Sequence, residues 1–238
     1  MSTGRVEALD TIRGAMILLM VIDHGVYDAL DIFYNSAAAD QYLENPVRFA
    51  VHVIGAFLFI ALSGASASVS RSNWRRGGKL AALAAGVTVV TYFFNPKLFV
   101  VFGILHLLAL ATLLYAAAKP WLRRTPNRAQ PYIYFTLMLV GMFFTKTVTV
   151  EVPWLWMFGF TTEKFASADY FPLIPWFFAY LFGVWAGPYL FGYALPGWFY
   201  KIKIRVFSAV GRRSLIVYLA HQPVLIGAMM VAADVLGR

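Results

Sequence analysis

The sequence contains no cysteine among its 238 residues. This absence excludes disulfide bonds, thiol catalysis and metal sites with cysteine ligands. It leaves the redox compartment open, because a membrane protein without disulfides can face either side of its membrane. We expect no metal site, since the four histidines fall on different apolar segments and no pair has the His-x3-His spacing of a helical metal motif.

Charged residues are also scarce. They make up 13% of the chain, against about 25% in soluble domains, whereas 61% of the residues are hydrophobic and the mean hydropathy is +0.68. This composition predicts an all-α, polytopic transmembrane helix bundle, because a helix satisfies its backbone hydrogen bonds internally in lipid. The net charge of +9 would suggest nucleic acid in a soluble protein, but here the cations are loop residues, so we expect no nucleic-acid partner.

Seven apolar segments are long enough to cross a bilayer, whose hydrocarbon core needs about 20 helical residues. They cover residues 14–34, 48–70, 79–95, 98–118, 131–149, 171–195 and 213–236. No linker, repeat or low-complexity segment long enough to mark a second domain separates them. We therefore expect one membrane domain over residues 1–238.

The cations are divided unevenly between the two sides of this arrangement. Of the 20 Lys and Arg residues, five fall on one side, namely Arg48, Lys97, Lys146, Lys164 and Arg238. The other fifteen lie near the N-terminus and in the loops after the second, fourth and sixth spans. The positive-inside rule then predicts a cytoplasmic N-terminus and an external C-terminus in a multi-pass protein of the cell membrane.

The first span carries ionisable residues that a lipid-facing helix would not keep. At about 100° per residue, five side chains fall within an arc of about 60°, namely Asp10, Arg13, His24, Asp28 and Asp31. Arg13 and His24 are separated by about three turns and about 16 Å of axial rise, half the hydrocarbon core. An ionisable side chain at membrane depth indicates a functional site, although Asp10 and Arg13 alone could form an interfacial i,i+3 ion pair.

Two further histidines lie within apolar segments. His106 stands among leucines in FGILHLLAL, where hydrogen bonding inside the bundle is the alternative to a chemical role. Ser214, Tyr218 and His221 share one face of the last span, and Pro223 kinks the helix just beyond them. The kink frees backbone carbonyls that must be satisfied inside the bundle, so we expect His221 to face protein or a cavity.

Several motifs together resemble one family of membrane enzymes. They are Asp10-Thr-Ile-Arg13-Gly14 followed by His24 and Tyr27-Asp28, then FGILHLLAL, FPLIPWFFAYLFGVWAG and GRRSLIVYLAHQPVL. In this order, over nearly the whole chain, they are similar to the prokaryotic heparan-alpha-glucosaminide N-acetyltransferase catalytic-domain family. Arg13 and His24 also resemble the Arg-x10-His motif of the wider membrane acyltransferase superfamily, in which the histidine is catalytic.

The resemblance implies an enzyme that moves an acetyl or other short acyl group from cytoplasmic acyl-CoA to an acceptor on the far side. The acceptor would be a hydroxyl or amine, as in an amino sugar or glycan. His24 would act as a general base or be acylated itself, and both routes stay open. Asp28 would hold the imidazole in its working tautomer, and Asp10 and Arg13 complete the catalytic set.

The cytoplasmic cations are candidate ligands for the phosphates of acetyl-CoA or another acyl-CoA, because arginine offers a planar fork of charged donors. Arg13 is the first candidate. The other candidates for binding acyl-CoA are Arg71, Arg75, Arg76, Lys79, His106, Arg213, Tyr218 and His221. The expected partners are thus acyl-CoA, a sugar-like acceptor and the lipid bilayer, and the sequence allows a homo-oligomer.

The remaining polar and aromatic features leave alternatives open. Asp23 points about 100° away from His24, which indicates helix packing or a part in fixing the tautomer. Arg48 and His52 can meet on one helix face, either on the acceptor side or merely at the interface. The aromatic loop before the sixth span suits an interfacial belt or a sugar-stacking platform. The small-residue run Ser63–Ser68 predicts close helix packing.

Two other functional classes compete with an acyltransferase. Intramembrane histidines and carboxylates also build proton relays, so a proton-coupled transporter or flippase is the main alternative. Transporters often have internal repeats and paired broken helices, and neither is clear in this sequence. A purely structural membrane protein would leave the polar face of the first span without a purpose.

Overall fold

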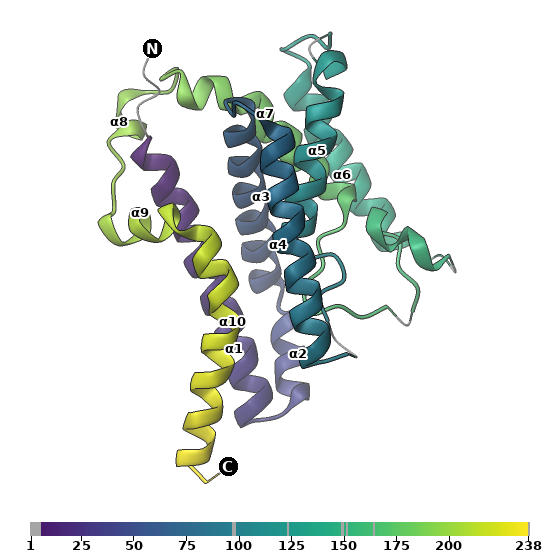
Figure 1. Cartoon of the computed structure of the whole chain (residues 1–238), viewed down its shortest axis with the longest axis vertical. Coiled ribbons are helices and arrows are strands. Elements are labelled where there is room, and N and C mark those ends of the chain that lie inside the picture. The colour runs from purple at the N-terminus through teal and green to yellow at the C-terminus, as the bar shows by residue number, and fades with distance from the viewer. Residues whose placement is uncertain are drawn as a thin grey trace. The chain divides into compact units, whose positions relative to one another are not determined.

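A computed structural model describes residues 6–96, 99–122, 124–148, 150, 152–163 and 165–237. Within these ranges the chain forms ten α-helices and one short 3-10 helix, and the only β pairing is an isolated bridge between Phe102 and Tyr170. The prediction of an all-α fold is confirmed. The chain divides into two compact units (Figure 1): unit 1 comprises Met1–Phe59 and Leu195–Arg238, and unit 2 comprises Ile60–Ala194.

Seven long helices correspond to the seven predicted spans. They are α1 (Glu7–Phe33), α3 (Pro46–Ser68), α4 (Asn73–Phe94), α5 (Ile104–Leu122), α6 (Gln130–Thr147), α7 (Leu173–Phe191) and α10 (Ser214–Val235). Five of them, α3, α4, α5, α7 and α10, are long and apolar enough to cross a membrane by length and composition. The other two are more polar, because α1 carries Asp23, Asp28 and Asp31 and α6 carries Gln130 and Lys146 at its ends.

Four short helices lie where the sequence suggested only loops. They are α2 (Ser36–Glu44), η1 (Pro153–Phe158), α8 (Gly197–Tyr200) and α9 (Arg205–Arg212). The first of these has a recognisable local signal, because the side chain of Asn35 accepts a hydrogen bond from the backbone N–H of Ala38 and caps the helix. All four are shorter than a membrane span, which is why a search for long apolar segments passed over them.

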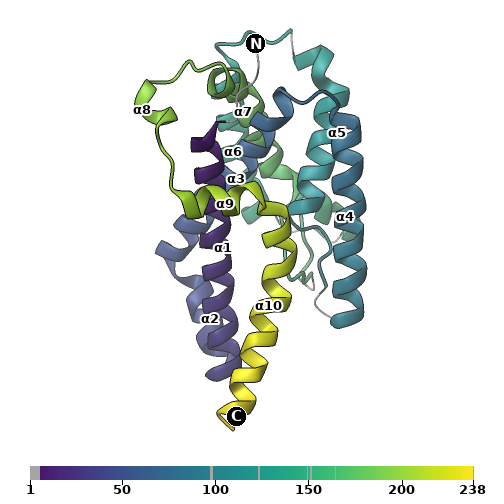
Figure 2. The same cartoon turned by 60° about the vertical axis from the view of Figure 1, so that its left-hand side comes forward.

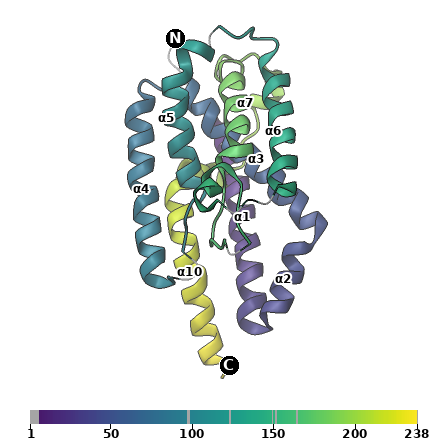
Figure 3. The same ribbon diagram turned by 90° about the vertical axis from the view of Figure 1, so that its right-hand side faces the viewer.

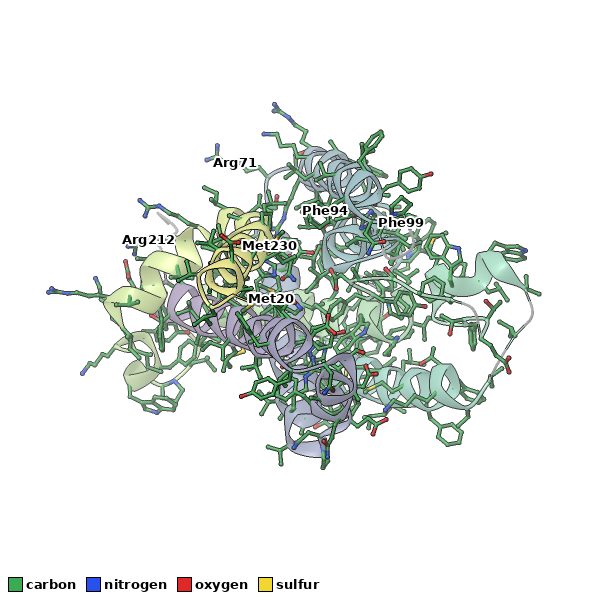
Figure 4. The ribbon with its side chains drawn as sticks, turned by 90° about the horizontal axis from the view of Figure 1, so that it is seen from below. Met20, Arg71, Phe94, Phe99, Arg212 and Met230 are labelled. Atoms are coloured by element: carbon green, nitrogen blue, oxygen red, sulfur yellow. The ribbon has the colours of Figure 1, made fainter. Side chains whose placement is uncertain are left out.

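In unit 1, α10 runs alongside α1 and α9 crosses it (Figure 2). Viewed from below, Met20 and Met230 mark the two neighbouring helices α1 and α10 (Figure 4). The crossing of α9 is fixed by Ser208, which is completely buried and donates a 2.7 Å hydrogen bond to the carboxylate of Glu7. α1 is thus the helix around which unit 1 packs.

In unit 2, α4 lies beside α5 and α6 lies beside α7 (Figure 3). The last part of α3 packs on α7 through two glycines. A Cβ on Gly64 would overlap the carbonyl oxygen of Tyr180, and a Cβ on Gly183 would overlap the carbonyl oxygen of Ala61. The close packing predicted for the small-residue run is therefore confirmed, since only a residue without a side chain lets the backbones approach this far.

Replacing Gly64 or Gly183 by Ala is expected to destabilise the protein by about 1–3 kcal/mol, the usual cost of forcing extra atoms into a packed core. The measurement is thermal unfolding of the purified protein in detergent. Gly86→Ala in α4 is the matched control, because nothing lies within 4 Å of its added Cβ. Equal melting temperatures for all three variants would contradict close α3–α7 packing.

Candidate active site

An ion pair lies in the N-terminal part of α1, the end that we predict to face the cytoplasm. Nη1 of Arg13 lies 3.4 Å from Oδ1 of Asp10, as the i,i+3 spacing predicts. The side chain of Asp10 is 7% exposed and that of Arg13 is 21% exposed. Both therefore lie mostly within unit 1, and the guanidinium keeps some access to solvent.

His24 meets His221 across the contact between α1 and α10. Nδ1 of His24 lies 2.9 Å from Nε2 of His221, and the two ring planes are inclined by 18°. Nδ1 of His221 in turn lies within hydrogen-bond distance of the backbone carbonyl oxygen of Tyr218, one turn earlier in α10. His24 is thus brought together with two predicted site residues of α10, Tyr218 and His221, that are distant from it in the sequence. The sequence predicted that His221 binds CoA, and the structure shows that His221 is also hydrogen-bonded to His24.

Asp28 has a different partner from the one expected. Its carboxylate accepts a 2.9 Å hydrogen bond from the side-chain amide of Gln222, and the imidazole of His24 is bonded to His221 instead. The reason is that His221 and Gln222 are consecutive in α10 and meet positions one turn apart on α1. Asp28 is nevertheless buried, with 9% of its surface exposed.

Asp23 joins three helices of unit 1. Its two carboxylate oxygens accept a pair of hydrogen bonds from Arg48 of α3, from Nε at 2.8 Å and from Nη2 at 2.6 Å. The hydroxyl of Tyr42 in α2 donates a third bond of 2.8 Å. Burial, and next the bond to Asp23, raise the pKa of Tyr42 above its usual value, so this phenol stays a proton donor. Asp23 is therefore a packing residue, one of the two roles that its position suggested.

His52 faces the same carboxylate, with Nδ1 3.9 Å from Oδ2 of Asp23. Arg48 and His52 therefore lie on one face of α3, as expected, and both side chains are directed at Asp23. Tyr42 was missed by sequence reasoning because it lies in the short helix α2. The one available signal was an aromatic hydroxyl close in sequence to an arginine and a carboxylate, which is too common to be specific.

Comparison with known proteins decides the family. Residues 5–223 match the family model described as heparan-alpha-glucosaminide N-acetyltransferase, catalytic. The chain belongs to this family. No curated protein and no solved structure matches the chain. The match runs from before α1 to Pro223 and so includes all of α1 with His24 and the first part of α10 with His221, and it makes the protein a membrane acetyltransferase in general.

The cations that we expect to bind the phosphates of CoA in this acetyltransferase differ in their exposure and in their hydrogen bonds. In unit 2, Arg76 is half-buried and its Nη2 donates to the carbonyl and hydroxyl oxygens of Ser63, at 3.2 and 3.0 Å. Arg71, Arg75 and Lys79 are exposed, and the side chain of Arg71 is labelled in Figure 4. Arg213 is exposed at the start of α10 in unit 1.

His106 of the acetyltransferase lies in a capping network of unit 2. Its Nδ1 accepts from the backbone N–H of Gly103 at 3.2 Å, and its Nε2 lies 3.0 Å from the hydroxyl of Thr88. That hydroxyl donates to the carbonyl of Val100 at 2.8 Å, so it accepts from His106. Both ring nitrogens are thus hydrogen-bonded inside unit 2. Hydrogen bonding inside the bundle was the alternative to a chemical role for His106. Its part in CoA binding stays a prediction.

The aromatic loop before α7 packs on itself and on Phe102, which precedes α5. The ring centroids of Phe165 and Tyr170 are 4.8 Å apart, and those of Phe102 and Trp156 are 5.8 Å apart. Burial raises the pKa of Tyr170 to about 12, and its hydroxyl donates to the carbonyl of Trp156. Two aromatic rings of the described part of this loop are exposed, Trp154 with 66% of its surface and Phe158 with 36%. Both interpretations of the loop, interfacial belt and sugar platform, depend on such an exposed ring.

Proposed function

We propose that this membrane acetyltransferase transfers an acetyl or other short acyl group from cytoplasmic acyl-CoA to the hydroxyl or amine of a sugar-like acceptor across the cell membrane. The observation that carries the proposal is His24, a half-buried imidazole in α1 with one nitrogen engaged by His221. The family supports acetyl transfer in general. A histidine at this depth supplies either a general base or a nucleophile for the thioester.

Arg13 and His24 supply the two ends of a path for the donor. They lie on one face of α1 and are separated by about three turns, or about 16 Å. The extended arm of CoA also separates its phosphates from its thioester. Phosphates held near Arg13 would therefore place the thioester nearer to His24, inside the membrane and closer to an acceptor on the opposite side.

The direct test of this proposal is acetyl transfer by the purified protein in detergent. Labelled acetyl-CoA is incubated with and without a panel of amino sugars and glycans, and label on each acceptor is measured. We expect acceptor-dependent transfer above a slow background hydrolysis. A folded protein that neither binds nor consumes acetyl-CoA or longer acyl-CoA would overturn the proposal.

Arg13→Ala is expected to weaken acyl-CoA binding about 10- to 100-fold, because a hydrogen bond to a charged group contributes about 1.5–3 kcal/mol. The measurement is the dissociation constant of acyl-CoA for the purified variant. Arg205→Ala in α9 is the control, since its side chain is exposed on the same predicted side. Unchanged affinity and activity in Arg13→Ala would remove this residue from the site.

The proposed sidedness can be tested with single cysteines, because the chain has none of its own. A membrane-impermeant maleimide should label Glu44→Cys in intact cells, since this exposed position follows the first predicted span. It should label Arg124→Cys only after the cells are permeabilised. The reverse pattern would show that the positive-inside assignment is inverted.

A further inference from the structure

The hydrogen bonds that link α10 to α1 assign the protons of two imidazoles. A backbone carbonyl oxygen can only accept, so Nδ1 of His221, which faces the carbonyl of Tyr218, carries a proton. A neutral imidazole has one N–H, and the cost of a charge at membrane depth favours the neutral form. Nε2 of His221 is then an acceptor, and Nδ1 of His24 must donate to it across 2.9 Å.

We propose that His221 is a positioning residue that holds His24 in the Nδ1–H tautomer and leaves Nε2 of His24 as the reactive atom. The catalytic consequence rests on the proposed function, whereas the tautomer itself does not. A second imidazole takes the place that a carboxylate occupies in a Ser-His-Asp triad, where the third residue also fixes tautomer and orientation.

The nearby carboxylates are engaged elsewhere in unit 1. Asp23 accepts from Arg48 and Tyr42, and Asp28 accepts from Gln222. Of the hydrogen-bond partners that the described residues give to His24, His221 is therefore the one able to orient its ring. Two further titratable groups lie near the pair, namely His52, which faces Asp23, and Tyr218, whose ring centroid is 5.7 Å from that of His221.

The assigned tautomer is suited to acyl transfer. In direct transfer, the acceptor O–H or N–H gives its proton to Nε2 of His24 while the acceptor atom bonds to the thioester carbonyl carbon. The C–S bond then breaks, and the leaving thiolate of CoA takes the proton from Nε2. Throughout, the Nδ1–H of the transient imidazolium still donates to the neutral Nε2 of His221, so the positive charge keeps a hydrogen-bond acceptor.

In the acyl-enzyme route the same Nε2 attacks the thioester carbonyl carbon and displaces the thiolate of CoA. The acceptor then attacks the acyl carbon, the bond from Nε2 to the acyl group breaks, and the acceptor proton passes to the thiolate. Both routes therefore use one atom of His24. The tautomer matters in each, because an Nε2 that already carries a proton is neither a base nor a nucleophile.

The kinetic test compares two substitutions at His221. His221→Leu removes the acceptor and should lower kcat about 10²-fold while the KM for acyl-CoA stays the same. His221→Gln keeps a side-chain carbonyl oxygen that can accept from Nδ1 of His24, and it should recover much of the lost rate. Val224→Ala, at an exposed position of α10, controls for general effects on the helix. Equal losses of rate in Leu and Gln variants would overturn the positioning role.

The decisive measurement is nitrogen NMR of protein labelled with ¹⁵N-histidine, which reports whether each ring nitrogen carries a proton. Only four histidines contribute, and His24→Ala identifies the signals of His24. We expect a protonated Nδ1 and an unprotonated Nε2 in the wild type, and a shift toward Nε2–H in His221→Leu. A wild-type His24 with Nε2–H, or a tautomer unaffected by His221→Leu, would overturn the inference.

This readout needs neither donor nor acceptor. A protein with the assigned tautomer but no reaction with acyl-CoA would therefore contradict the proposed function alone and support the tautomer assignment. An active enzyme with the opposite tautomer would contradict the assignment alone.

Discussion

His24→Ala is expected to lower the rate of acyl transfer about 10²- to 10⁴-fold, the usual contribution of a general base, and further if the residue is acylated. Acyl-CoA should still bind, because a base or nucleophile contributes more to the chemical step than to ground-state binding. The measurement is kcat with the dissociation constant for acyl-CoA determined in parallel. Leu19→Ala is the control, since Leu19 is an exposed apolar residue of the same helix.

A His24→Ala variant with near-normal transfer would defeat this mechanism and direct attention to His106 or His221. If transfer is lost as expected, labelled acetyl-CoA without acceptor separates the two chemical routes. Label that stays covalently on His24 of the wild type indicates an acyl-enzyme, whereas its absence favours direct attack by the acceptor.

Arg48→Met is expected to destabilise the protein by about 3 kcal/mol, the lower end of the cost of breaking a buried ion pair, because it leaves the half-buried carboxylate of Asp23 without its cation. The side chains of Asp23 and Arg48 are each 17% exposed, and the guanidinium contributes two of the hydrogen bonds to this carboxylate. The effect is measured by thermal unfolding in detergent, with the exposed Arg205→Ala as control.

The double variant Asp23→Leu with Arg48→Met tests the reason for that loss. Replacing a buried ion pair by apolar residues of similar volume is often neutral or stabilising, so most of the stability should return. Part of the loss should remain, since the hydroxyl of Tyr42 also bonds to Asp23. An Arg48→Met variant as stable as the wild type would show that the pair does not hold α1, α2 and α3 together.

Much of the fold could be predicted because a bilayer restricts a chain to long apolar helices. Each of the seven predicted spans overlaps one long helix of the structure, with differences at the ends. The predicted span at 98–118 begins too early, since α5 starts at Ile104. There Asp169, which is distant in sequence, accepts the backbone N–H of Ile104 and caps the helix.

The sequence by itself determined the helical class, the ion pair of Asp10 with Arg13, the polar face of α1 and the family. Each depends on hydropathy, on spacing within one helix or on the order of motifs, and these are local properties of the chain. It also indicated that His221 faces protein, because Pro223 demands satisfied carbonyls nearby.

Only the tertiary structure decided which residue each polar group meets. His24 and His221 are 197 positions apart, and Asp28 and Gln222 are 194 apart. The expected pairing of His24 with Asp28 followed from their spacing of one turn on α1. Which faces of two helices meet depends instead on packing across the whole interface, and periodicity along a single helix does not encode that.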